Sequence, residues 1–348
     1  MKNAIYRIIA VILVASLIIT MNISAVASTS EEDRDDGGEV QISSSAGKGG
    51  VRVYDMETGE EKYIPPIAND GSDNTPIPAS EELMEEDVTA SARIRDMYKL
   101  TPVSSVEGRY ASTCLIASRF IKDGKEDHVE IGTGWLINDS YLMTAGHILY
   151  SGDYGYAHHT AVYVGASGGN YKQYRLGHVL SVGGDFFDHP SYFEYDSGYL
   201  GTLQKQNYDD MGMFDDWGIV KLDSPVTANV GHLGRYAINQ VENMYNRYYY
   251  TQGYPGALQT ASSWNKFVMY EEYGLISGEV QMRYLPLVWS GMTGYPGQSG
   301  SPLYSYRTGL GYCAEGILVS NATLDSRRVT QYIMYNDWLN NYVNTYCK

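Results

Sequence analysis

Hydrophobic positions in the second part of the chain come in short runs. Each run is rich in β-branched and aromatic residues, and clusters of Gly, Asn and Asp separate one run from the next. This pattern is typical of β-strands that end in turns. The runs are Thr113–Ser118, Gly134–Ile137, Ala161–Val164, His178–Val182, Tyr248–Thr251, Phe267–Tyr270, Leu285–Trp289 and Gly316–Ser320.

A helical period appears near the end of the chain, although Asn336 interrupts it. The part of the chain after residue 95, about 250 residues long, lies within the size range of one all-β unit, so no further domain is required. The pattern therefore predicts an all-β fold followed by a terminal helix. The residues of the helical stripe are Val329, Tyr332, Ile333, Leu339, Tyr342 and Val343.

The segment 28–95 has a different composition from the part that follows. Within 28–92 there are 17 Asp and Glu against 4 Lys and Arg, and large apolar residues are few. Such a segment buries too little surface to offset the entropy lost on ordering, which predicts disorder. We interpret 28–95 as an acidic propeptide, with the mature chain starting between Ala92 and Thr101. A solvated linker without a regulatory role is the alternative.

Residues 1–27 have the pattern of a secretory signal peptide. Lys2 and Arg7 precede the apolar run Ile8–Ile19, and Ala25–Ala27 suits a signal peptidase. The alternative is a membrane anchor, but the run is shorter than the roughly 20 residues that span a bilayer. We therefore expect a secreted, extracellular protein that is not inserted in a membrane once the signal is removed.

The segment Thr293–Pro302 places Ser299 between small residues, as acyl transfer to a serine requires. The N–H groups of Gly297 and Ser299 are candidate donors to the oxygen that becomes negative, and Gly300 lets the chain leave the turn. A Gly-x-Ser-Gly run also has the composition of an ordinary turn, so this segment alone does not establish a nucleophile.

Two other blocks carry the partners that such a serine needs. The apolar run Leu142–His147 ends in a histidine, a candidate base for the Ser299 proton. Asp216 opens the strand-like run Asp216–Leu222 and is a candidate to fix the imidazole tautomer. The neighbouring Asp215 is the alternative, and the alternation that follows Asp216 favours Asp216. The other histidines lack this context: His128, His158, His159, His178, His189 and His232.

The blocks Thr144–His147, Asp216–Leu222 and Gly297–Pro302 resemble, in this order, the catalytic blocks of chymotrypsin-fold (trypsin-like) serine endopeptidases. The resemblance is closest to the secreted bacterial glutamyl endopeptidases. Gly253–Gly256 and Arg328–Thr330 extend it, so that it covers roughly residues 103–348.

The resemblance implies two antiparallel six-stranded β-barrels. Residues 96–230 would form the first, with His147 and Asp216, and residues 231–348 the second, with Ser299 and the helix. It also implies a zymogen, protein or peptide substrates, a monomer, and no nucleic acid. No cofactor or metal is expected, because His158 and His159 have no companion at ligand spacing.

The sequence departs from the family at the residues that recognise a glutamate. The family has a histidine in a Gly-Ile-His segment, whereas this chain has Leu318, and Thr293 is shifted by one position from the family's threonine. With Thr293 and Leu318 as substrate-binding residues, we expect an uncharged residue before the scissile bond, or at most a weak Glu preference carried by Thr293, backbone N–H groups or the new N-terminus. The alternative is that His232 from another loop replaces the missing histidine. Gln298 replaces the aspartate that pairs with a new N-terminus in the digestive enzymes.

Three cysteines allow at most one internal disulfide, with open connectivity: Cys114, Cys313 and Cys347. The family's common pair beside the histidine is absent, since Ile148 follows His147 and Gly132 or Thr133 stands in place of the partner. Two other functions remain open. One is a catalytically silent binding protein of this fold, and the other is a cell-wall-associated protein, suggested by 33 tyrosines.

Overall fold

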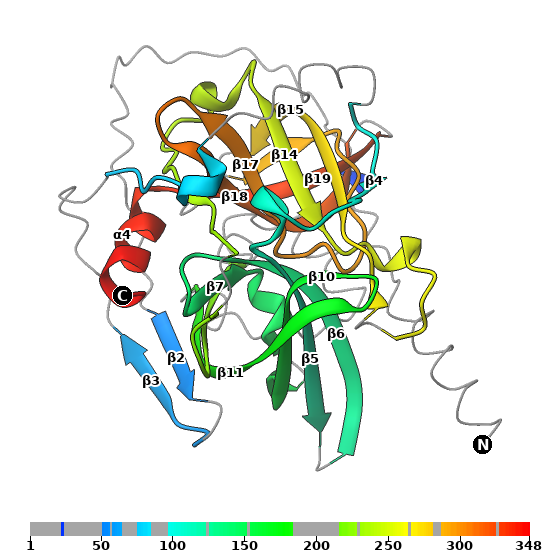
Figure 1. The fold of residues 1–348 in the computed structure, drawn as a ribbon, viewed down its shortest axis with the longest axis vertical. Coiled ribbons are helices and arrows are strands. Elements are labelled where there is room, and N and C mark those ends of the chain that lie inside the picture. Colours follow the sequence, from blue (N-terminus) through cyan, green and yellow to red (C-terminus); the bar gives the residue numbers. More distant parts are fainter. Residues whose placement is uncertain are drawn as a thin grey trace, which may run out of the picture.

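The computed structural model describes the chain in segments. They are residues 22–23, 51–55, 58–64, 75–84, 97–122, 125–151, 154–183, 216–227, 230–263, 266–280, 287–324 and 327–348. The described part is all-β with a C-terminal helix, as the sequence predicted. Figure 1 shows two β-sheet units stacked on one another, the N-terminal one in green and the C-terminal one in yellow to orange.

The N-terminal unit is an antiparallel sheet in the order β10-β5-β6-β7-β12-β11, with β2 and β3 beyond β11. Strand β10 also pairs with β11, which joins the two ends of the six-stranded part. A two-stranded hairpin, β8 (Tyr150–Ser151) and β9 (Gly155–Tyr156), lies apart. The six strands are β5 (Thr113–Lys122), β6 (Lys125–Leu136), β7 (Tyr141–Thr144), β10 (His159–Ser167), β11 (Asn170–Gly183) and β12 (Gly218–Leu222).

The C-terminal unit is a closed six-stranded barrel in the order β18-β17-β14-β15-β16-β19, because β19 pairs back to β18. Its interior is mainly apolar, with Tyr249, Leu303 and Leu318 in one buried cluster. Three two-residue strands attach to it: β1 (Asn22–Ile23), β4 (Thr101–Pro102) and β13 (Gly234–Arg235). The barrel strands are β14 (Tyr248–Gly253), β15 (Tyr270–Val280), β16 (Leu287–Ser290), β17 (Pro302–Arg307), β18 (Gly311–Leu324) and β19 (Arg327–Met334).

The terminal helix α4 (Asp337–Tyr346) starts later than the sequence predicted. Residues 329–333 belong to β19, because pairing with both β16 and β18 outweighs the helical spacing of their apolar side chains. Asn336, which seemed to interrupt the helix, is its N-cap, and its side chain accepts a hydrogen bond from the Leu339 N–H at 3.0 Å. Residues 267–269, expected in a strand, precede β15.

The acidic segment 28–95 is partly ordered. Strands β2 (Val51–Asp55) and β3 (Glu61–Ile64) form a hairpin, and β2 pairs with β11. In the 3₁₀ helix η1 (Glu81–Leu83), Leu83 is buried among apolar residues. The expectation of disorder is wrong for these residues, because strand pairing and apolar burial order them locally. Removal of the segment stays a prediction, and residues 1–21 and 24–27 of the predicted signal lie outside the described residues.

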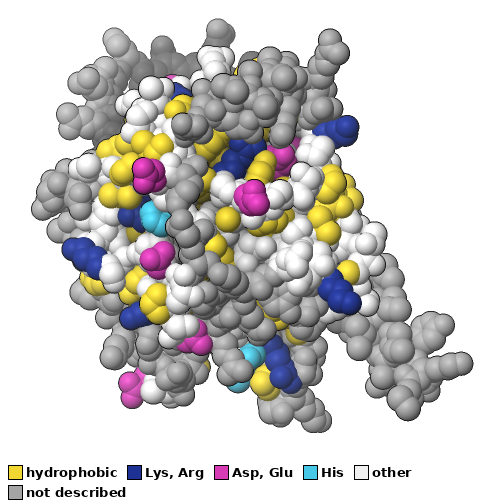
Figure 2. Space-filling view, viewed as in Figure 1, with side chains coloured by type: hydrophobic (Ala, Val, Ile, Leu, Met, Phe, Trp, Pro, Cys, Tyr) yellow, Lys and Arg dark blue, Asp and Glu magenta, His cyan; other side chains and the backbone are white. Residues whose placement is uncertain are grey.

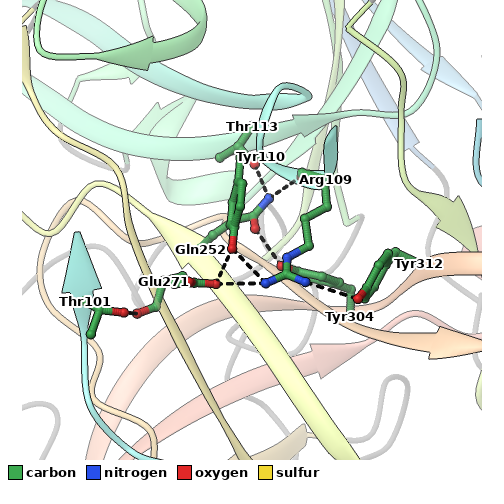
Figure 3. Close-up of polar contacts among 8 residues, drawn as sticks. All are labelled: Thr101, Arg109, Tyr110, Thr113, Gln252, Glu271, Tyr304 and Tyr312. Atoms are coloured by element: carbon green, nitrogen blue, oxygen red, sulfur yellow. Dashed lines mark hydrogen bonds and ion pairs between the residues drawn. The ribbon is translucent and has the colours of Figure 1, made fainter. Parts of the chain in front are cut away.

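A buried polar cluster, which we call the Arg109 clasp, joins the two units (Figure 3). The Arg109 guanidinium forms an ion pair with Glu271 of β15 at 3.1 Å and contacts the Tyr110 hydroxyl at 2.7 Å. Gln252 of β14 donates to the Thr113 hydroxyl of β5 at 2.6 Å. The clasp comprises Arg109, Tyr110, Thr113, Gln252, Glu271, Tyr304 and Tyr312.

The three cysteines, Cys114, Cys313 and Cys347, are buried and free, so no disulfide joins them. Acidic, basic and hydrophobic side chains are interspersed on the face drawn in Figure 2. Packing and the Arg109 clasp therefore hold the described units together without a covalent cross-link.

Candidate active site

Strand pairing brings His147 and Asp216 together. His147 lies in the 3₁₀ helix η4 (Gly146–Ile148), which begins two residues after β7 ends, and Asp216 lies two residues before β12. These strands are antiparallel, with Gly218 opposite Thr144. The Asp216 carboxylate accepts two hydrogen bonds, from the His147 backbone N–H at 2.8 Å and from the ring Nδ1 at 2.6 Å. The ring is thereby fixed with its Nε2 left to accept a proton.

The environment of His147 favours its protonated form. Burial alone would lower the pKa of the imidazole, but the Asp216 carboxylate, with a contribution from Glu130, outweighs burial and raises the pKa of His147 above its usual value. Asp216 is itself nearly buried, and the His147 side chain is 33% exposed. A carboxylate placed in this way stabilises an imidazolium as it forms.

The terminal helix supports Asp216 from behind. The next residue, Trp217, is fully buried, and its ring packs at 5.6 Å against both Trp338 and Tyr342 of α4. An aspartate beside this aromatic cluster has little freedom to move away from His147.

The turn that carries Ser299 requires two glycines in left-handed conformations. Gly297 has φ +96°, and a Cβ there would overlap the carbonyl oxygen of Tyr254. Gly300 has φ +89°, and a Cβ there would overlap the Thr133 carbonyl and the Thr144 hydroxyl. Since Thr144 lies three residues before His147, the close approach of Gly300 brings the serine turn against the histidine segment.

Hydrogen bonds hold the turn on both sides. The Thr133 hydroxyl donates to the Gly297 carbonyl at 2.7 Å, and the Thr133 N–H donates to the Ser299 carbonyl at 2.8 Å. Among the hydrogen bonds of the described residues, none has the N–H of Gly297 or Ser299 as donor. An N–H group without an acceptor in the protein is free to donate to a ligand, so these two are candidate donors to a substrate oxygen.

Ser299 itself is partly exposed. Within the described segments, no hydrogen bond joins its hydroxyl to the His147 ring. Catalytic hydrogen bonds are often long in the absence of substrate. The structure thus brings His147 and Asp216 into direct contact and places the Ser299 turn beside the segment that precedes His147.

Gln298 holds the turn internally. Its side chain is buried, and the side-chain oxygen accepts a hydrogen bond from the Tyr295 N–H at 3.0 Å. The backbone N–H of Gln298 donates to the Tyr295 carbonyl at 3.0 Å. An uncharged amide therefore stabilises the turn from within, without an ion pair to a new N-terminus.

The predicted substrate-binding residues lie in different surroundings. Leu318 is 1% exposed and packs inside the apolar barrel, while its backbone bonds to Gly300 and Ser301. Thr293 is partly exposed, and its N–H donates to the carboxylate of Glu272 at 2.7 Å. Leu318 thus supports the serine turn from inside the barrel, and its contact with substrate stays a prediction.

His232 is distant from the serine turn. Its backbone exchanges hydrogen bonds with Ser80, and the neighbouring Ala79 bonds to Leu310, in the turn after β17. Ser299 precedes β17, at the opposite end of that six-residue strand. The alternative that His232 replaces the missing histidine is therefore wrong.

Two contributing residues were missed by the sequence reasoning. Thr133 had been noted only as standing in place of a cysteine, yet it bonds to both Gly297 and Ser299. Glu272 was not singled out, although a charged residue at an inward-facing strand position signals a special role. Asp215, the alternative to Asp216, lies outside the described residues.

Two further findings concern the described part of the chain. No three His, Cys, Asp or Glu residues there are grouped as a metal ion would require. None of the helices in the described segments is long and apolar enough to cross a membrane.

Comparison with known proteins gives structural matches only. No protein-family model matches the sequence, and no curated protein matches it. The chain is similar in structure to a Glu endopeptidase, at 19% identity and a TM-score of 0.49, covering 71% of this chain and 95% of that one. It is also similar to the protease Anisep from Arthrobacter nicotinovorans, at 18% identity and a TM-score of 0.43, covering 70% and 96%.

Proposed function

We propose that this chain is a serine endopeptidase in which Ser299 is the nucleophile, His147 the base and Asp216 the group that orients it. One observation carries the proposal. His147 and Asp216, which are joined by two hydrogen bonds, lie beside the serine turn with its two left-handed glycines. In that turn, the N–H groups of Gly297 and Ser299 have no acceptor within the described residues.

In the first half of the reaction, the Ser299 Oγ attacks the carbonyl carbon of the peptide bond and its proton passes to His147 Nε2. Asp216 stabilises the imidazolium, and the N–H groups of Gly297 and Ser299 bind the oxygen that becomes negative. The C–N bond then breaks, and the proton on Nε2 passes to the leaving amine. An acyl-enzyme on Ser299 remains.

In the second half, water attacks the ester carbonyl and gives its proton to His147 Nε2. The bond between the carbonyl carbon and Oγ breaks, and Oγ takes the proton back. His147 thus acts as base and then as acid in each half, which requires the neutral imidazole at the start.

The proposal also covers the two barrels, the export signal and the activation of a zymogen. Residues 96–230 and 231–348 form two six-stranded barrels with the site between them. Residues 1–27 direct export, and removal of 28–95 activates a zymogen. The paired ladders of the two units support the two-barrel assignment. For the substrate, we propose an uncharged residue before the scissile bond, with Thr293 and Leu318 forming that part of the site.

Labelling with a fluorophosphonate probe, followed by peptide mapping, tests the function. We expect one modified residue, Ser299, with no labelling of Ser299→Ala and greatly slowed labelling of His147→Ala. The exposed serine variant Ser224→Ala is the matched control and should label like the wild type. A folded wild-type protein that does not label at Ser299 would instead be a binding protein of this fold.

A further inference from the structure

The carboxyl group of Glu272 lies beneath the start of the serine turn. In β15, Glu272 occupies the same alternation as Ile276 of the barrel interior, and only 1% of it is exposed. One of its oxygens, Oε2, accepts the Thr293 N–H at 2.7 Å. Thr293 is the first residue of the segment 293–300, which carries Ser299 and which we call the nucleophile loop.

Glu272 lacks the charged partner that a buried carboxylate usually has. No ion pair among the described residues includes it, and its second oxygen, Oε1, is buried without a hydrogen-bond partner there. The side chains of Thr251 and Tyr332, both buried, belong to the same barrel interior. Burial without a cation raises the pKa of Glu272 to about 7, although hydrogen bonds with Thr293 lower it in part.

The other groups that hold the nucleophile loop keep their charge state near neutral pH. The Gly297 carbonyl accepts from the Thr133 hydroxyl at 2.7 Å, and the Pro296 carbonyl accepts from the Gly256 N–H at 2.7 Å. Arg328, which donates to the Gly294 carbonyl at 2.7 Å, is always a cation.

The groups that face Glu272 also keep their charge state. Tyr332 remains neutral, because burial, followed by the Glu272 charge, raises its pKa well above the usual value. The hydroxyls of Thr251 and Thr293 do not titrate. Glu272 is therefore the one group in this set whose charge changes near neutral pH.

We propose that Glu272 is a positioning residue for the reaction, and that its ionised form, through Thr293, holds the nucleophile loop in the reactive arrangement. This inference rests on the proposed function. A hydrogen bond from an N–H group to a carboxylate is about twice as strong as one to a neutral carboxyl group. Protonation of Glu272 loosens the start of the loop, and a small displacement of Ser299 slows attack.

The proposal predicts an acid limb with two protons. His147 and Glu272 must both lose a proton before the site is active, so log kcat/KM should approach a slope of two against pH below both pKa values. In Glu272→Gln, the amide oxygen still accepts the Thr293 N–H but does not titrate, so the slope should be one. Its kcat at pH 8 should fall about 10- to 100-fold, with KM nearly unchanged.

Glu271→Gln is the matched control, because it removes the neighbouring carboxylate, which faces Arg109 instead of the loop. We expect it to lower stability and keep the slope of two. A wild-type slope of one, or a slope of two in Glu272→Gln, overturns the proposal.

A second measurement uses the wild type and does not depend on activity. Hydrogen exchange at the Thr293 amide, corrected for intrinsic pH dependence, should show about tenfold less protection at pH 5.5 than at pH 8. Protection that is the same at both pH values overturns the positioning role. Absence of labelling at Ser299 overturns the proposed function instead, so the two failures are distinguishable.

Discussion

Two adjacent carboxylates of β15, Glu271 and Glu272, belong to different electrostatic environments. Glu271 belongs to the Arg109 clasp (Figure 3), where it bonds to the Arg109 guanidinium and to the Tyr110 hydroxyl at 2.5 Å. The rings of Tyr110, Tyr250 and Tyr312 surround the same guanidinium, with centroids at 4.9, 4.9 and 5.2 Å. The Glu271 charge is neutralised by Arg109, and this ion pair joins the two sheet units.

Glu272 faces the opposite side of the strand and has no cation beside it among the described residues. Its carboxylate accepts the Thr293 N–H of the nucleophile loop. A buried carboxylate without a cation destabilises the folded chain, and such destabilising groups concentrate at functional sites. We therefore expect that the Arg109 clasp maintains the fold, whereas the Glu272 side serves the proposed reaction.

The largest effect is expected at the loop itself. Ser299→Ala and His147→Ala should each lower kcat for peptide hydrolysis by about 10⁶, because triad members act as a unit. Ser299 adds little to the buried core, so the urea midpoint of Ser299→Ala should stay at the wild-type value. A variant that loses stability together with activity would show that this side also maintains the fold.

The next effect is expected in the Arg109 clasp. Arg109→Met leaves Glu271 buried without a cation and should lower the free energy of unfolding by about 3–5 kcal/mol. The double variant Arg109→Met/Glu271→Gln should regain much of that loss. Urea denaturation of the wild type, Arg109→Met, Glu271→Gln and the double variant measures the coupling energy between Arg109 and Glu271. The kcat of the folded fraction should change little, and a single variant as stable as wild type contradicts the assignment.

A third effect is the pH dependence of stability. The pKa of Glu272 rises from 4.5 to about 7 on folding, so between these values the folded chain holds a proton that the unfolded chain has lost. Stability should therefore fall as pH rises through this window, by about 3 kcal/mol. In Glu272→Gln this fall should disappear, leaving the decline above pH 6.5 that follows from the raised pKa of His147. Urea midpoints between pH 4 and 8 measure both contributions.

The smallest effect compares two glycines with left-handed conformations. Gly309, φ +78°, has no atom within 4 Å of an added Cβ, whereas Gly297 meets the Tyr254 carbonyl. Gly309→Ala should cost about 1–2 kcal/mol in stability, with unchanged kcat. Gly297→Ala carries the same strain and also moves the loop, so its kcat should fall about 100-fold. Equal kcat values for Gly309→Ala and Gly297→Ala would show that the close contact of Gly297 with the Tyr254 carbonyl does not matter for the reaction.

Local patterns predicted most strands and the contact of His147 with Asp216. Thr113–Ser118 and Ala161–Val164 lie within β5 and β10, because β-branched runs between turn residues report local structure. Val329–Ile333 misled the prediction, since apolar residues at positions shared by both periods fit a helix and a strand. Pairing with β16 and β18, which are distant in sequence before folding, decided between them.

The supports of the site could not be read from local pattern. Thr133 bonds to Gly297, 164 positions further along the chain, and Glu272 bonds to Thr293, 21 positions away. Nothing in their immediate neighbours specifies those partners, because the contacts depend on how the barrels pack. Side chains that carry the chemistry have sequence blocks of their own, while the groups that hold them depend on the completed fold.

The three buried thiols leave this fold without a disulfide that a reductant could break. Burial raises the pKa of Cys347 to about 12, and burial, with the Glu315 charge, raises that of Cys313 to about 12. The thiolate is the reactive form of cysteine, and with a pKa of about 12 on the order of one such thiol in 10⁵ is ionised at pH 7. A reductant therefore has no disulfide to break among these three cysteines, and we expect the urea midpoint to be the same with and without one.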